Sequence, residues 1–66
     1  MDARYPNIAV KLPGRGGNAF TIISETAHAL RDAGVAEQEV KAFRTECMSG
    51  DYDHVLHTCM RWVEVR

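Results

Sequence analysis

Residues 51–66 read DYDHVLHTCMRWVEVR, and this stretch decides how the rest of the 66-residue chain can fold. Its apolar side chains recur at the spacing of one buried helix face. They are Tyr52, Val55, Leu56, Cys59, Met60 and Val63. Asp51 is a suitable cap for this helix, because its carboxylate can accept the free backbone N–H groups of the first turn. From Trp62 onward the side chains alternate with a period of two, which predicts a terminal strand over residues 62–65.

Two more helices are predicted before this stretch. The first starts at Ala19 with Asn18 as its cap, and Gly34 follows its end. Its expected buried residues are Ala19, Phe20, Ile22, Ile23, Ala27, Leu30 and Ala33. The second starts after Ala36, a poor cap, so the acidic residues of its first turn must favour the helix start. Its expected buried residues are Val40, Phe43 and Cys47, with Met48 extending the packing toward the turn at Gly50.

A strand is predicted near the start of the chain. Residues 8–12, IAVKL, alternate so that Ile8, Val10 and Leu12 face the core. The predicted order is therefore strand, helix, helix, helix, strand, and the two strands most simply pair with each other. We predict a small α+β fold, one domain over residues 1–66, with three helices packed on one face of a two-stranded antiparallel ribbon.

Composition excludes several classes of protein. The net charge of −1 gives no basic field for nucleic acid, which makes nucleic acid an unlikely partner. No apolar run approaches 18 residues, so no membrane span is expected. No signal peptide or lipidation motif is visible, and the spacing of Cys47 and Cys59 matches no zinc or redox motif. Two free thiols and no export signal predict a cytoplasmic protein.

A glycine-rich turn is the first candidate for binding chemistry. It lies between the first strand and the first helix, and with the following alanine it fits the G-x-G-x-x-A pattern of a dinucleotide loop. Its residues are Gly14, Arg15, Gly16, Gly17 and Asn18. A nucleotide domain also needs a second parallel strand with a ribose-binding acid, for which the chain has no room. The remaining alternatives are a flexible turn and an incidental anion site.

Histidines and cysteines offer no complete catalytic or metal site. His54 and His57 share a helix face, but a closed metal site needs three or four ligands, and Cys59 points to the other side of that helix. Both cysteines lie on apolar helix faces, where they act as small hydrophobic residues. We therefore expect no enzyme activity, no cofactor and no metal.

Five short strings are similar to those of a group of short uncharacterised proteins from phages, prophages and bacterial genomes. They are YPN at 5–7, GNAF at 17–20, ALRDAGV at 29–35, SGDYDH at 49–54 and MRWV at 60–63. The chain departs from the group at residues 13–16, where relatives are more often acidic. The resemblance implies a phage-related origin, and it provides no catalytic residues to carry over.

The predicted function is a small binding module that acts through a surface instead of a cleft. The expected surface comprises His54, His57, Arg61 and Trp62, with a host or phage protein, or a second copy, as the partner. One specific version is an inhibitor of a host defence complex in the host cytoplasm. The alternative is an accessory nucleic-acid, nucleotide or anion binder that uses the turn from Gly14 to Asn18 with Arg15. We further expect a homodimer joined through a terminal strand, because each strand has an unpaired edge.

Overall fold

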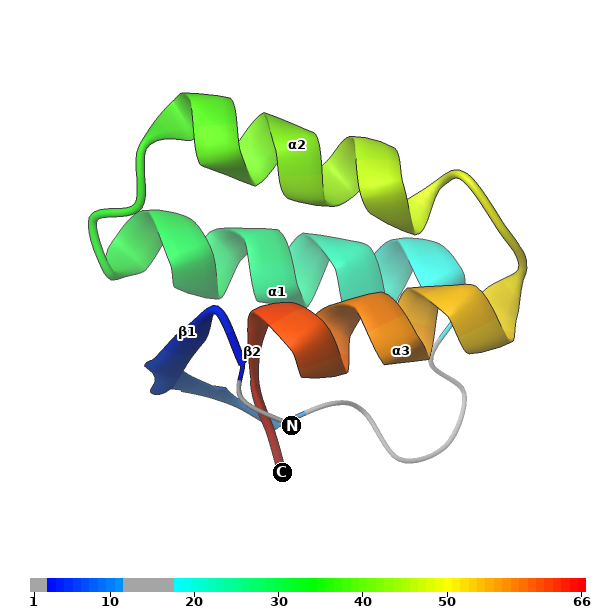
Figure 1. Ribbon diagram of the computed structural model, residues 1–66, viewed down its shortest axis with the longest axis horizontal. Helices are drawn as coiled ribbons and strands as arrows, with labels where there is room; N and C mark the ends of the chain where they lie inside the picture. The colour runs from blue at the N-terminus through cyan, green and yellow to red at the C-terminus, as the bar shows by residue number, and fades with distance from the viewer. Residues whose placement is uncertain (1–2, 12–17) are drawn as a thin grey trace.

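The computed structural model describes residues 3–11 and 18–66. Within this part of the chain the element order is β1 (Tyr5–Val10), α1 (Ala19–Asp32), α2 (Glu37–Cys47), α3 (Tyr52–Trp62) and β2 (Val63–Val65). The predicted order and the α+β class are thus confirmed. The three helices pack against one another, and the two short strands lie together at one end of α1 and α3 (Figure 1). No helix in the described residues is long and apolar enough to cross a membrane.

The helix boundaries follow from capping. Asn18 Oδ1 accepts a hydrogen bond of 2.8 Å from the Thr21 backbone N–H, and Asp51 Oδ1 accepts one of 3.0 Å from the His54 N–H. Each side chain satisfies a donor that a helix start leaves without a partner. Both predicted caps are confirmed. Ala36, the cap of α2, makes no side-chain bond, and two glutamates occupy the first turn instead.

The end of α1 is a Schellman turn. Gly34 has a φ of +87°, its N–H bonds to the Arg31 carbonyl at 3.0 Å, and the Val35 N–H bonds to the Leu30 carbonyl at 3.0 Å. Arg31 then donates to both carboxylate oxygens of Glu37, at 2.9 and 2.8 Å, across the turn into α2. This hydrogen-bonded pair lowers the pKa of the Glu37 carboxyl. The predicted helix stop at Gly34 is confirmed.

The strand direction was predicted wrongly, because β1 and β2 run parallel. Tyr5 pairs with Val63, Ala9 with Glu64 and Val10 with Val65. Four steps along β1 therefore match one step along β2, so residues 6–8 bulge out of the pairing. Pro6 lies in this bulge, where the missing N–H of proline breaks no ladder hydrogen bond. The first strand also begins earlier than predicted, and Leu12 lies outside the described residues.

The core draws on all three helices and both strands. It comprises Val10, Ile22, Ile23, Ala27, Leu30, Val40, Phe43, Cys47, Val55, Cys59, Trp62 and Val63. Two threonines, Thr26 and Thr58, are also fully buried. Thr58 Oγ1 donates to the His54 carbonyl at 2.8 Å, and Thr26 Oγ1 lies 3.6 Å from Cys59 Sγ. A buried hydroxyl is tolerated only when it is hydrogen-bonded in this way.

Several residues predicted to be in the core lie on the surface. On α1 the predicted Ile22, Ile23, Ala27 and Leu30 are buried, with Thr26 beside them. On α3 the buried face is rotated from the predicted one toward Thr58 and Trp62. The side chains displaced to the surface are Phe20, Ala33, Tyr52 and Met60. Met48, at the end of α2, is exposed as well.

Candidate protein-interaction surface

Trp62, predicted as part of a binding surface, belongs to the core. Only 6% of it is exposed. Its ring stacks on Tyr5 at 6.0 Å between centroids and meets Phe43 edge-on at 5.5 Å. The Arg4 guanidinium lies 4.9 Å from the Trp62 ring centroid, a cation–π distance. Trp62 therefore joins β1 to α2 and α3, and cannot itself contact a partner.

Glu46 fixes the neighbouring side chains. Its carboxylate accepts a hydrogen bond of 2.8 Å from Trp62 Nε1 and one of 3.1 Å from Arg61. The first bond gives the indole N–H of Trp62 the acceptor that a buried tryptophan usually finds. The second holds Arg61 in an ion pair on the surface, so this cation is already partly neutralised.

His54 is also committed to the fold. Its Nε2 lies 2.9 Å from the Glu46 carbonyl and 3.0 Å from Ser49 Oγ, at the end of α2. A Cβ on Gly50 would lie 2.6 Å from the imidazole, so only glycine leaves room for this ring. Of the predicted surface, only His57 and Arg61 are exposed, and with Met60 they border a hollow beside His54. We call His57, Met60 and Arg61 the α3 face.

A second surface lies where α1 begins, α2 ends and α3 begins. The exposed fractions of Phe20, Met48 and Tyr52 are 69%, 56% and 46%. These three side chains surround a hollow of about 270 Å³, which is also lined by the core residues Ile23, Cys47 and Val55. We call Phe20, Met48 and Tyr52 the helix-end patch. Sequence periodicity assigned Phe20 and Tyr52 to buried faces. That prediction was wrong because each residue lies in the first turn of its helix, beyond the reach of the core.

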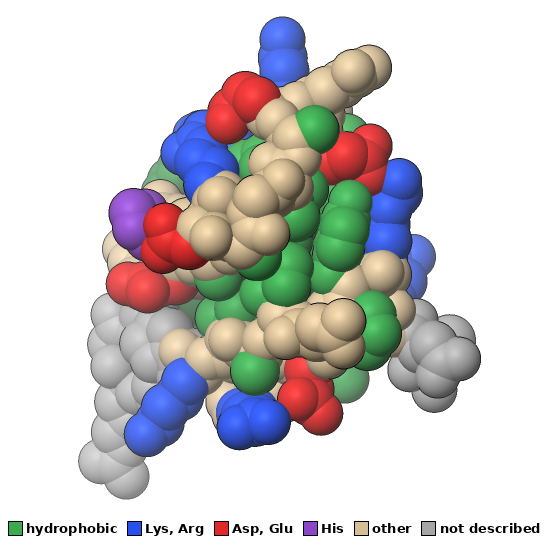
Figure 2. Space-filling view, turned by 90° about the vertical axis from the view of Figure 1, so that its left-hand side faces the viewer, with side chains coloured by type: hydrophobic (Ala, Val, Ile, Leu, Met, Phe, Trp, Pro, Cys, Tyr) green, Lys and Arg blue, Asp and Glu red, His purple; other side chains and the backbone are tan. Residues whose placement is uncertain are grey.

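A third hollow, of about 570 Å³, runs between β1 and the turn that joins α1 to α2. Figure 2 shows hydrophobic side chains gathered on this end of the molecule. The hollow is lined by Tyr5, Pro6, Ile8, Val35 and neighbouring residues. Glu39 closes one side, because its carboxylate pairs with Arg4 and accepts a hydrogen bond of 3.2 Å from the Tyr5 hydroxyl.

The buried thiols are poor candidates for chemistry. Cys47 and Cys59 are reduced and fully buried, as predicted. Hydrogen bonding with Cys59, together with burial, raises the pKa of the Cys47 thiol, which keeps it protonated at neutral pH. Among the described residues no group of three His, Cys, Asp or Glu side chains could hold a metal ion.

The glycine-rich turn was the other predicted binding site. Gly14, Arg15, Gly16 and Gly17 lie outside the described residues. Asn18 is described, and its side-chain oxygen is occupied by the Thr21 N–H and the Thr21 hydroxyl. Comparison of the chain with protein-family models, curated proteins and solved structures finds no match.

Proposed function

We propose that this protein is a small binding module that recognises another protein through the helix-end patch. The observation that carries the proposal is the grouping of three large, exposed apolar side chains around one hollow. Exposed apolar groups scattered singly need no explanation, but a contiguous patch beside a hollow is typical of an interaction site. Aromatic residues and methionine are also the residue types enriched in protein interfaces.

The helix-end patch is preferred over the α3 face for an energetic reason. On the α3 face, Arg61 is held by Glu46, and the adjacent His54 is held by Ser49 and a backbone carbonyl. A partner that used these polar groups would have to replace existing hydrogen bonds. The helix-end patch presents apolar surface that gains free energy simply by leaving water.

The resemblance to phage proteins suggests where the partner would be found. We further propose that the partner is a protein of an infected cell. In the most specific form of this proposal, the present protein inhibits a host defence complex. Such an inhibitor needs only to occupy a surface, which a chain of 66 residues can do.

Two methionine variants test this proposal. Met48 and Met60 have almost the same exposed fraction, 56% and 57%, but only Met48 belongs to the helix-end patch. Tagged wild-type, Met48→Gln and Met60→Gln proteins would be mixed with bacterial lysate and with untagged copies, and the captured proteins identified by mass spectrometry. We expect Met48→Gln to reduce capture of an identified partner about tenfold and Met60→Gln to leave it unchanged, since interface residues at a patch centre dominate affinity. The reverse result would assign binding to the α3 face and overturn the proposal.

A further inference from the structure

We infer that the helix-end patch is the two-fold interface of a homodimer, so that its occupant is a second copy of this chain. This inference rests on the proposed function, in that the helix-end patch binds protein, but it assigns the patch to a second copy in place of a host protein. Its support comes from the shape of the patch and from the charges on its two sides.

The shape is self-complementary. Phe20 projects into solvent at the border of the 270 Å³ hollow. A cavity of about 150 Å³ is enough to hold a benzene ring. A two-fold axis through the patch therefore allows each Phe20 to enter the hollow of the other copy. A projecting side chain and a receiving hollow on the same surface are what an isologous contact requires.

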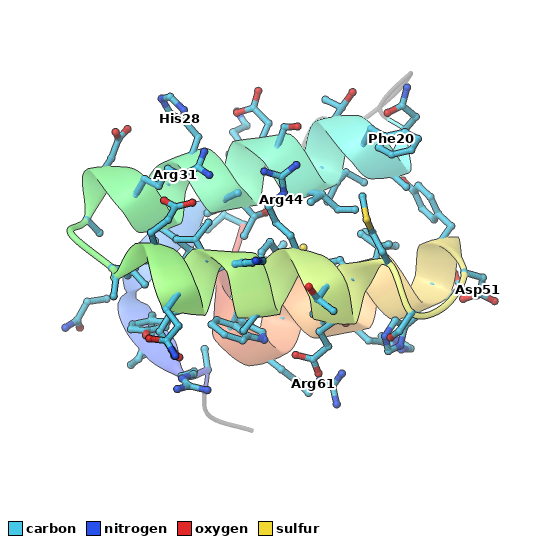
Figure 3. The ribbon with its side chains drawn as sticks, turned by 90° about the horizontal axis from the view of Figure 1, so that it is seen from above. Phe20, His28, Arg31, Arg44, Asp51 and Arg61 are labelled. Carbon is cyan, nitrogen blue, oxygen red and sulfur yellow. The ribbon has the colours of Figure 1, made fainter. Side chains whose placement is uncertain are left out.

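The charges around the patch are also self-complementary. Met48 borders a further hollow, which is lined by Lys41 and Arg44 and by Glu37, whose carboxylate is paired with Arg31. Asp51 lines the patch hollow itself, and Asp53 follows Tyr52 in the first turn of α3. Figure 3 shows Phe20 between Arg44 and Asp51 along the length of the helices. The patch thus lies between a basic and an acidic side.

Lys41, Arg44 and Asp53 are available for a partner. One oxygen of Asp51 caps α3, and its other oxygen makes no hydrogen bond with a described residue. The ion pairs formed between described residues involve none of Lys41, Arg44, Asp51 and Asp53. A two-fold axis at right angles to the line from the basic to the acidic side places the basic side of one copy opposite the acidic side of the other, and it does so twice. A uniformly acidic or basic partner would match one side and be repelled by the other. A second copy matches both.

The strand edge, the site first expected for self-association, is the weaker choice. The bulge at residues 6–8 and the proline within it are devices that keep an edge strand from pairing with another chain. β2 offers only three residues. The helix ends carry no such protection.

The patch is small, so the dimer should be weak. Its three side chains expose roughly 300 Å² of apolar surface, given about 200 Å² for a whole large side chain. A standard interface buries about 800 Å² on each partner, and the charged residues beside the patch add only part of the missing area. We expect a dissociation constant on the order of 10 µM, raised by salt because the ion pairs are near the surface.

Sedimentation equilibrium from about 1 to 500 µM tests the inference on the full chain. Wild type should dimerise, Met48→Gln should raise the dissociation constant about tenfold, and the matched Met60→Gln should leave it unchanged. Each variant is first shown to have the circular dichroism and thermal midpoint of the wild type. A dimer that both methionine variants leave intact would overturn the inference.

A double-mutant cycle then tests the charge pairing. Arg44→Gln and Asp51→Asn remove one charge each, and asparagine is as good a helix cap as aspartate, so α3 keeps its start. We expect each single variant to raise the dissociation constant about threefold. The double variant should have the same dissociation constant as either single variant, because the two residues form one contact that either substitution already removes. Independent, multiplicative effects would contradict the pairing.

A monomeric wild type whose helix-end patch still captures a different protein would overturn the homodimer and leave the proposed function standing. A monomer with no patch-dependent capture would overturn both.

Discussion

Trp62 is the residue on which the packing of this small protein depends most. Its ring is in contact with Tyr5 from β1 and Phe43 from α2, while its own backbone ends α3. Its N–H reaches Glu46, whose side chain is 38% exposed and also holds Arg61. One surface carboxylate therefore satisfies a buried donor, and the two interactions of Glu46 should differ in strength.

Replacing Glu46 separates these two interactions. Glu46→Ala should lower the free energy of unfolding by about 1–3 kcal/mol, because it leaves the Trp62 N–H without an acceptor. Glu46→Gln keeps an oxygen acceptor and should lose less than about 1 kcal/mol. Arg61→Gln, which removes only the exposed ion pair, should cost about 0–1 kcal/mol. Urea unfolding followed by tryptophan fluorescence measures all three. Equal losses for Glu46→Ala and Arg61→Gln would show that the indole hydrogen bond contributes nothing.

Residue-level prediction from the sequence succeeded where a side chain's environment is set by local chemistry. Both cysteines are buried as expected, because thiol side chains are among those most often buried, whereas Trp62, expected on the binding surface, is buried as well. It failed for Thr26 and Thr58, which were not among the residues expected to be buried. Their hydroxyls are satisfied by Cys59 Sγ and by a backbone carbonyl, and no sequence pattern reveals that such a partner will be in reach.

At the scale of elements, the three helices could be predicted because their signals are local. Asn18 and Asp51 bond to backbone groups three residues away, and Gly34 supplies the positive φ that ends α1. The candidate surface could be predicted only in part. The sequence placed His57 and Arg61 on one exposed face, but the helix-end patch is formed by three helix ends that meet only in the folded molecule.

The start of α2 is the weakest element boundary and can be improved. Ala36 has an extended backbone and no side chain that can cap the helix, although Glu39 stands at the third helical position. Ala36→Ser should raise the free energy of unfolding by about 0.5–1 kcal/mol, since serine can accept a backbone N–H of the first turn. The thermal midpoint should rise by about 2–8 °C. Ala42→Ser, in the exposed middle of the same helix, is the control and should lower stability slightly. A fall in midpoint with Ala36→Ser would mean that the first turn has no free donor.

At the scale of the whole molecule, the sequence does not determine strand direction. The two strand patterns are compatible with either pairing, and they lie at opposite ends of the chain, so no turn between them fixes the register. The direction depends on where the packed helices place the end of α3 relative to β1. The chain is also short, and a domain of this size buries only about 60% of its unfolded surface, so even a three-residue strand matters.

Removal of residues 64–66 tests the parallel register directly. The truncation deletes the partners of Ala9 and Val10 and the hydrogen bond of 2.9 Å from the Arg66 N–H to the Val10 carbonyl. The loss of these bonds and of the partly buried Val65 should lower the free energy of unfolding by about 2–4 kcal/mol. The thermal midpoint should fall by about 10–30 °C. A full-length variant with Glu64→Gln and Arg66→Gln, which removes only the exposed ion pair between them, should lose less than about 1 kcal/mol.

The position of the damage within β1 distinguishes the two directions. In the parallel register Tyr5 keeps its partner Val63, and the Arg4 N–H keeps its hydrogen bond of 2.8 Å to the Arg61 carbonyl. NMR order parameters of the truncated protein at low temperature should therefore fall at Ala9 and Val10 while they stay high at Arg4 and Tyr5. An antiparallel ribbon would place the start of β1 opposite the deleted residues, so it would loosen Arg4 and Tyr5 first. That pattern would refute the parallel sheet, because only the register determines which end of β1 loses its partner.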